Sequence, residues 1–158
     1  MKKPDKTNAM RILDRVKADY KTYFYGDGEA IPGDEVAREL GADPARVFKT
    51  LVTVGASKAN YVFMIPVTGE LDLKKAAKAV GEKNIVMIKS KELLPLTGYI
   101  HGGCSPIGMK KQFVTTVHES AGDFETIFFS GGRIGCQVEL SLDTLKGIVP
   151  LKTADLLQ

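Results

Sequence analysis

The chain of 158 residues is 44% hydrophobic and 26% charged, a composition typical of a globular protein with a buried core. The chain has 22 lysine and arginine residues against 19 aspartate and glutamate residues, which gives a net charge of +3. This charge is too small for a protein that coats nucleic acid through its overall positive charge, so we exclude that class. No apolar run is long enough to cross a membrane, and the start of the chain lacks the apolar segment of a signal peptide, so we expect one cytoplasmic domain over residues 1–158.

In the first half of the chain, capping residues and apolar spacing predict three helices. Thr7 can cap a first helix that runs to about residue 17, and the helices over 32–40 and 73–80 end at Gly41 and Gly81. Runs of β-branched and aromatic residues predict strands over 21–25, 48–54, 61–66 and 85–88. Because the polar segment between the second and third strands is short, we expect these two to form a hairpin.

The second half predicts a short helix over 90–94, which Pro95 helps to end, and strands over 113–117, 126–130 and 136–140. Ser141 and Thr153 are placed to cap two further short helices. Strands outnumber helices, and several connections are too short for a crossover helix. We therefore expect an α+β fold in which a mainly antiparallel, barrel-like mixed sheet has helices packed outside it.

The segment Gly102–Lys111 reads GGCSPIGMKK and is the strongest indication of a functional site. Glycines let the backbone come close to a ligand, and successive N–H groups in such turns hold an anion or polarise a carbonyl. Pro106 restricts its own φ and the conformation of Ser105, which stiffens the loop. A tight turn needs one glycine and this loop has more, so we expect it to bind a ligand.

Lys49 lies in the apolar run VFKTLV, where a buried lysine is costly unless it has a partner. In a cleft its cation would hold a carboxylate, a phosphate or a polarised carbonyl. At a sheet edge it would instead discourage aggregation or extend to water, and periodicity favours neither interpretation.

A second glycine-rich segment, Gly131–Gly135, follows the strand ending at Ser130 and carries Arg133 at its tip. The segment is typical of a hairpin, and an RNA phosphate is the natural functional partner for its arginine. Tyr23 and Tyr25 could stack on bases, although aromatic residues at alternating strand positions more often pack in a core.

Other chemistries find little support in the sequence. Cys104 and Cys136 have no CxxC spacing, so we expect free thiols, and together with His101 and His118 they match no zinc-finger spacing. His101 is too close to Cys104 for a dyad of the kind that distant segments assemble, and no Gly-x-Ser-x-Gly elbow is present. The dinucleotide and Walker fingerprints are also absent, and we expect neither a cofactor nor a metal.

Taken together, these segments resemble the YbaK/EbsC family of freestanding aminoacyl-tRNA deacylases, which are related to the editing domain of prolyl-tRNA synthetases. The resemblance runs through the blocks GDEV, VFKTLV, LDLKKAAK, TGY, GGCSPIGMKK and SGGRIG, in the family's order and spacing, over nearly the whole chain. It implies a translation-fidelity enzyme that removes mischarged cysteine from tRNA(Pro) and acts on Cys-tRNA(Cys). Charged tRNA would be its substrate, and prolyl-tRNA synthetase is a candidate partner.

By this resemblance the catalytic positions are Lys49, Gly102 and Gly103. In cysteine-specific members the substrate's own thiol attacks its ester, which makes the enzyme a lyase if the thiol cyclises and an ester hydrolase otherwise. Such an intramolecular attack gains an effective molarity of roughly 10⁵ M or more when well oriented. The resemblance also assigns substrate-binding roles to Tyr23, Thr50 and Ser130, and we add the adjoining loop residues Ser105, Pro106, Gly131, Gly132 and Arg133.

Some positions depart from the pattern of the cysteine-editing bacterial members. Three departures lie in the glycine loop, at Cys104, Ile107 and Met109. In addition, Pro32 stands in place of an aromatic residue, and Gln137 stands where an acidic residue can occur. Deacylation of Ala-tRNA(Pro), or of tRNA carrying other small amino acids, is therefore an alternative function. A non-catalytic tRNA- or synthetase-binding module is another.

Overall fold

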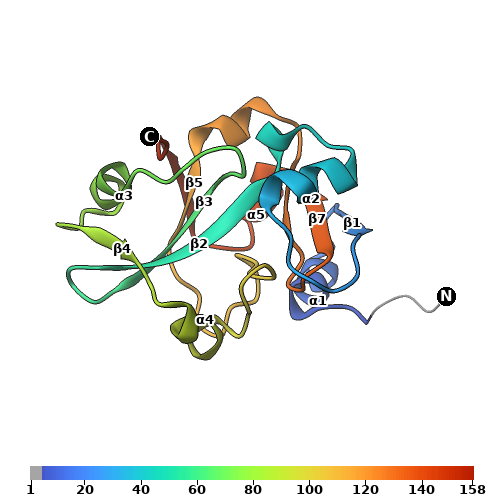
Figure 1. Ribbon diagram of the computed structural model, residues 1–158, viewed down its shortest axis with the longest axis horizontal. Helices are drawn as coiled ribbons and strands as arrows, with labels where there is room; N and C mark the ends of the chain where they lie inside the picture. The colour runs from blue at the N-terminus through green and yellow to red at the C-terminus, as the bar shows by residue number, and fades with distance from the viewer. Residues whose placement is uncertain (1–4) are drawn as a thin grey trace.

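The computed structural model describes residues 5–158, in which helices are interspersed among single strands and hairpins (Figure 1). The α-helices of this part of the chain are α1 (Asn8–Arg15), α2 (Gly33–Leu40), α3 (Leu73–Val80), α4 (Ser90–Thr97) and α5 (Leu142–Lys146). The strands are β1 (Lys21–Phe24), β2 (Phe48–Gly55), β3 (Asn60–Pro66), β4 (Ile85–Met87), β5 (Thr115–His118), β6 (Ile127–Ser130), β7 (Cys136–Leu140) and β8 (Leu151–Ala154). Among the described helices, none is both long and apolar enough to span a membrane.

The strands form two sheets. One is five-stranded in the order β4-β2-β3-β5-β8, and the other is three-stranded in the order β1-β7-β6. The pairs β3–β5 and β5–β8 are parallel and the remaining pairs are antiparallel, so the predicted α+β class with mainly antiparallel pairing is confirmed. The predicted barrel-like sheet is not supported, because the strands divide between two sheets and no closed barrel forms among residues 5–158.

The predicted helix starts are confirmed by side chains that cap them. The Thr7 hydroxyl accepts a hydrogen bond from the Met10 N–H at 3.1 Å, and the Ser141 hydroxyl accepts one from Thr144 at 3.1 Å. Asp72 likewise accepts from the first turn of α3. These bonds satisfy amide groups that have no partner inside the helix, which is why short polar residues are favoured at these positions.

Two local predictions were wrong. Pro95 lies inside α4, which continues to Thr97 and ends at Gly98 with a φ of 86°. A proline removes only one helical donor, and here the helix tolerates that loss close to its end. Thr153 caps no helix, because residues 151–154 form β8, in parallel pairing with β5. Long-range pairing with an existing strand therefore prevailed over a local capping signal.

Buried apolar residues fill the space between the two sheets. Phe48 and Met64 of the five-stranded sheet pack with Phe129 and Val138 of the three-stranded sheet and with Met10 of α1. On the other face of the larger sheet, α3 covers a second cluster with two buried alanines. In Figure 1 the larger sheet occupies the left and centre, and β1 and β7 lie at the right, so β2 runs between the two halves of the molecule.

Candidate functional site

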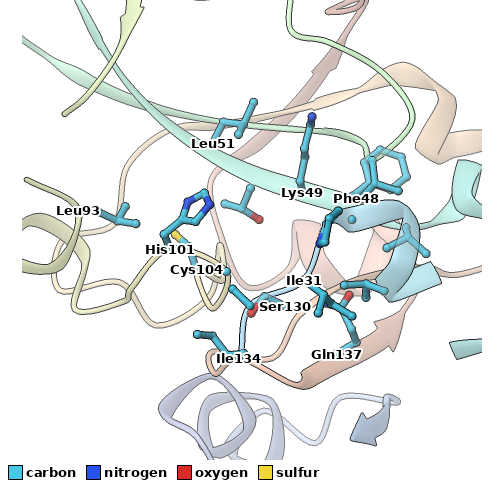
Figure 2. A pocket seen from close by; sticks show the side chains of 18 of the residues that line it. Ile31, Phe48, Lys49, Leu51, Leu93, His101, Cys104, Ser130, Ile134 and Gln137 are labelled. Carbon is cyan, nitrogen blue, oxygen red and sulfur yellow. The ribbon is translucent and has the colours of Figure 1, made fainter. Parts of the chain in front are cut away.

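A cavity of about 420 Å³ opens beside β2, where the two sheets approach each other. Its walls come from several separate segments of the chain: the loop before α2 and the start of that helix, β2, Val67 after β3, the β4–α4 connection, the glycine loop, and the ends of β6 and β7. Figure 2 shows Leu93, His101 and Cys104 on one side of the space and Ile31, Ser130 and Gln137 on another. The sequence-predicted glycine loop therefore does lie beside the strand that carries Lys49.

The cavity lies at an open edge of β2. Consecutive residues 48–52 all line it, although alternate residues of a strand face opposite sides of a sheet. This is possible because β4 pairs with β2 only at Thr53–Gly55, and an isolated bridge joins Val47 to Phe128. Between these two points no strand of residues 5–158 pairs with this edge of β2, so both faces of the strand reach the cavity.

Backbone groups of β2 also face the open edge. The Ile88 N–H donates to the Val52 carbonyl at 3.3 Å, which shows that the backbone groups of Val52 point away from β3. Because these groups alternate in direction along a strand, those of Thr50 point to the same edge. An unpaired strand edge is a row of donors and acceptors, and here it faces a cavity that a ligand can enter.

Two buried side-chain oxygens in the cavity wall have no hydrogen-bond partner among the described residues. They are Thr50 Oγ1 and Gln137 Oε1. Burying such a group without a partner costs about 1–3 kcal/mol, and native proteins leave few of them unsatisfied. Their position in the wall of one cavity makes them candidate partners for a bound ligand.

Lys49 lies on the opposite face of β2 from Thr50. In Figure 2 its side chain and that of Leu51 extend to one side of the strand, whereas His101 and Cys104 lie on the other. Lys49 is half-buried, lines the cavity and forms no salt bridge with residues 5–158. Its ammonium group is therefore available to an anionic or carbonyl oxygen at the open edge.

The two leading glycines of the loop differ in their surroundings. Gly102 has a φ of 87° and lines the cavity. Gly103 does not line it, and its N–H donates to the Ile100 carbonyl at 3.0 Å. A Cβ at position 103 would lie 3.0 Å from the Ile134 nitrogen, so this glycine lets two turns pack closely. Nor do Ser105 and Pro106 line the cavity; both are buried, and the Ser105 hydroxyl accepts from the Ile107 N–H at 3.3 Å.

The second glycine turn is divided between the cavity and another hollow. Ser130 lines the cavity, and its hydroxyl accepts a hydrogen bond from the Gly132 N–H at 3.1 Å. Gly131, Gly132 and Arg133 do not line it, and the Arg133 guanidinium donates to the Asp5 carbonyl at 2.8 Å. Of the predicted substrate-binding residues in this turn, the structure therefore brings only Ser130 to the cavity.

Tyr25, not Tyr23, is the tyrosine in the cavity wall. The hydroxyl of Tyr23 donates to Glu139 Oε1 at 2.5 Å, and its ring lies 5.6 Å from that of Phe128. Glu139 also receives bonds from Arg46 and Thr126, so Tyr23 belongs to a polar cluster that ties β1 to β7. Residues two positions apart share a face of a continuous strand, but β1 ends at Phe24, so Tyr25 lies beyond the strand and its position did not follow from that of Tyr23.

Gln137, Tyr25 and His101 also line the cavity, although none of them was among the predicted site residues. The only signal for Gln137 was its departure from the family pattern. Burial raises the pKa of the Cys104 thiol to about 12, so this residue is a protonated wall group at neutral pH and a poor nucleophile. Within residues 5–158, no group of three or more His, Cys, Asp or Glu side chains is arranged to hold a metal ion.

Comparison with known proteins places these observations in context. A family model described as an aminoacyl-tRNA editing domain matches residues 32–148. A protein of Enterococcus faecalis, described as "Putative Cys-tRNA(Pro)/Cys-tRNA(Cys) deacylase EbsC", is 47% identical over 145 residues, which cover 91% of this chain and 88% of that protein.

Two solved structures share the fold. One is described as "Crystal structure of a putative trans-editing enzyme for prolyl tRNA synthetase"; its TM-score is 0.84 at 23% identity, with 98% of this chain and 99% of that chain covered. The other, "hypothetical protein APE2540", has a TM-score of 0.84 at 20% identity, with 96% of this chain and 100% of that chain covered. At these identities the likeness concerns the fold alone.

Proposed function

The chain belongs to the aminoacyl-tRNA editing domain family, and we propose that it is a deacylase that removes cysteine from mischarged tRNA(Pro) and from tRNA(Cys). The deacylase description of the Enterococcus faecalis relative, at 47% identity, supports this assignment. Its place would be the cytoplasm, where charged tRNA is used in translation. The observation in this chain that carries the proposal is the pair of unpartnered oxygens of Thr50 and Gln137 in one cavity.

These oxygens suit an aminoacyl ester. The ammonium group of the amino acid carries N–H donors for Gln137 Oε1, and the Thr50 hydroxyl can donate to the ester carbonyl. The adjoining edge of β2 and the N–H of Gly102 offer further backbone groups, and Lys49 places a cation at the same edge. A cavity of about 420 Å³ lies within the usual range for small-molecule sites, roughly 300–1,000 Å³.

The reaction then needs no nucleophile from the protein. The sulfur of the cysteinyl group attacks its own ester carbonyl, the bond to the ribose oxygen breaks, and that oxygen leaves with a proton. Since Cys104 remains protonated at neutral pH, it does not compete with the substrate thiol. The walls of the cavity contribute by holding the ester and thiol in the reactive arrangement and by stabilising the developing oxyanion.

The decisive experiment replaces Lys49 with methionine, which keeps an apolar stem of similar length but removes the charge. We expect Lys49→Met to lose nearly all deacylation of Cys-tRNA(Pro) while unfolding at the wild-type temperature. Lys146→Met is the matched control, because Lys146 is exposed on α5 and lines neither the cavity nor the adjoining hollow. Unchanged turnover by Lys49→Met would contradict the assigned site.

A panel of tRNAs charged with cysteine, alanine, serine and proline tests the substrate. Cysteine should be removed fastest, because only its thiol can attack the ester from within the substrate. Equal rates for alanine and cysteine would establish a general small-residue deacylase instead. No turnover on any member of the panel would leave a binding module.

We further propose that prolyl-tRNA synthetase supplies recognition of the tRNA body, since a net charge of +3 provides little electrostatic attraction over the whole chain. Deacylation of Cys-tRNA(Pro) should then be faster in the presence of the synthetase. The difference should be greatest at high salt, where direct phosphate contacts are weakened. Identical rates with and without the synthetase at every salt concentration would exclude this partner.

A further inference from the structure

A second hollow of about 670 Å³ lies directly beside the candidate active site. Its lining includes the start of α1, the Gly98–Ile100 segment and the Gly132–Ile134 turn. Ile134 lines both hollows, and the consecutive residues Ile100 and His101 line one each. The two spaces are therefore neighbours on either side of a ridge formed by Ile100, His101 and Ile134.

The charge of this second hollow is positive. Lys6, Arg11 and Arg133 line it, against the single acidic residue Asp5. The first cavity, by comparison, has one lysine, Lys49, and one acidic residue, Glu29, among the residues that line it. For a chain whose net charge is only +3, this is a local concentration of cations, and two of them are guanidinium groups.

The two arginines are held differently and both remain able to bind an anion. Arg133 is half-buried, and the hydrogen bond to the Asp5 carbonyl fixes its orientation while leaving other N–H groups of the guanidinium unused. Arg11 is exposed and forms neither a salt bridge nor a side-chain hydrogen bond with residues 5–158. Lys6, in contrast, already pairs with Asp14. Guanidinium groups recognise phosphate oxygens through paired hydrogen bonds.

The floor between these arginines is rigidly packed. The Thr7 hydroxyl, which caps α1, also donates to the Gly131 carbonyl at 2.5 Å. Gly132 has a φ of 101°, and a Cβ there would lie 3.1 Å from the Tyr99 ring and 3.3 Å from Thr7. The first turn of α1 is therefore packed against the second glycine turn. This packing fixes the distance between the backbones of Arg11 and Arg133 and their position beside the ridge.

We propose that this hollow binds the phosphodiester backbone at the single-stranded 3′ end of the charged tRNA while the aminoacyl ester occupies the first cavity. The inference rests on the proposed deacylase function. The ester stands on the terminal ribose, and the phosphates of the last nucleotides follow it directly, so a substrate that crosses the ridge places them among the arginines. Ile100, which is 51% exposed at the ridge, provides an apolar surface for a base.

The test measures the deacylation of two substrates by the wild type and by the variants Arg11→Gln and Arg133→Gln. Cysteinyl-tRNA(Pro) carries the phosphates, whereas 3′-cysteinyl-adenosine carries the same ester without any. We expect Arg11→Gln to lower kcat/KM for the tRNA about tenfold or more, a loss of about 1.4 kcal/mol or more, with turnover of cysteinyl-adenosine unaffected. The dependence of log kcat/KM on log salt should become shallower by about 0.7 for the one lost contact.

Arg38→Gln is the matched control, because Arg38 is an exposed arginine on α2 that lines neither hollow. Equal losses on both substrates, or an unchanged salt slope for Arg11→Gln and Arg133→Gln, would overturn the proposal while leaving the deacylase function intact. Binding of an uncharged oligonucleotide ending in CCA, followed by fluorescence anisotropy, tests the hollow without turnover. If the wild type and the arginine variants bind it equally, the phosphate site is refuted. If the wild type deacylates neither substrate, the proposed function fails separately.

Discussion

Replacing Gly103 with alanine tests whether the glycine loop depends on close packing against the Arg133–Ile134 turn. A Cβ at position 103 would lie 3.0 Å from the Ile134 nitrogen and 3.1 Å from the Arg133 carbonyl carbon. These are backbone atoms, which cannot rotate away as a side chain can, so the turns must separate by a few tenths of an ångström. Overpacking of this kind costs about 1–3 kcal/mol. Each kcal/mol lowers the melting temperature of a chain of this size by about 2–4 °C.

Gly122→Ala provides the matched control, because a Cβ at that exposed position meets nothing within 4 Å. Thermal unfolding should therefore show a lower melting temperature for Gly103→Ala and no loss for Gly122→Ala. Deacylation of Cys-tRNA(Pro), measured where both variants are folded, should also fall for Gly103→Ala, because Ile134 forms part of the cavity wall. If the two variants melt at the same temperature, the packing argument is refuted. A destabilised Gly103→Ala with full activity would show that the site tolerates movement of the turn.

Three further predictions concern individual side chains. Burial raises the pKa of Cys104 to about 12 from 9.0, so iodoacetamide should label the native thiol about a thousandfold more slowly than a free thiol at pH 7.5. The labelling rate is followed by mass spectrometry, and labelling as fast as that of a free thiol would contradict the prediction. Thr50→Val should unfold at or above the wild-type temperature, because it removes a buried hydroxyl without a partner. The same variant should deacylate Cys-tRNA(Pro) at least tenfold more slowly, and an unchanged kcat/KM would show that no ligand uses this hydroxyl. Burial acts to raise the pKa of Glu139, but the hydrogen bonds that its carboxylate accepts and the nearby guanidinium outweigh burial and hold this pKa below 4.5. The carboxylate therefore stabilises the fold above its ordinary pKa, and this stabilisation is lost as the pH falls. Glu139→Gln should lower the free energy of unfolding in urea by about 1–3 kcal/mol at pH 7, and an equal loss below the folded-state pKa would contradict this.

Local features of the fold were largely predictable from the sequence. Thr7, Asp72 and Ser141 begin helices because each can satisfy amide groups within its own turn. The hairpin of β2 and β3 followed from two β-prone runs and a short polar connection. The prediction failed where a distant partner decided the outcome: Thr153, expected to cap a helix, lies in β8 and pairs with β5 instead.

The residues of the candidate site were also only partly predictable from the sequence. The resemblance to the editing family identified Lys49, Thr50, Gly102 and Ser130, and the structure brings these four to one cavity. It could not separate them from equally prominent motif residues such as Gly103 and Arg133, which lie outside that cavity. Membership of a motif shows which segments meet, whereas the direction of each side chain depends on the packing of the sheets.

The sequence by itself determined the family, the residue types of the site and the positions of most helices and strands, because periodicity, capping and motif order are local or linear properties. Only the tertiary structure decided that β4 leaves β2 after Thr53 and that β6 meets it only at Val47, which opens the edge between them. The pairing of strands is set by contacts between segments far apart in the chain, and no local signal records where such pairing stops. Thr50, whose hydroxyl has no partner among the described residues, lies on that open edge, and the cavity beside it borders the basic hollow at Ile134.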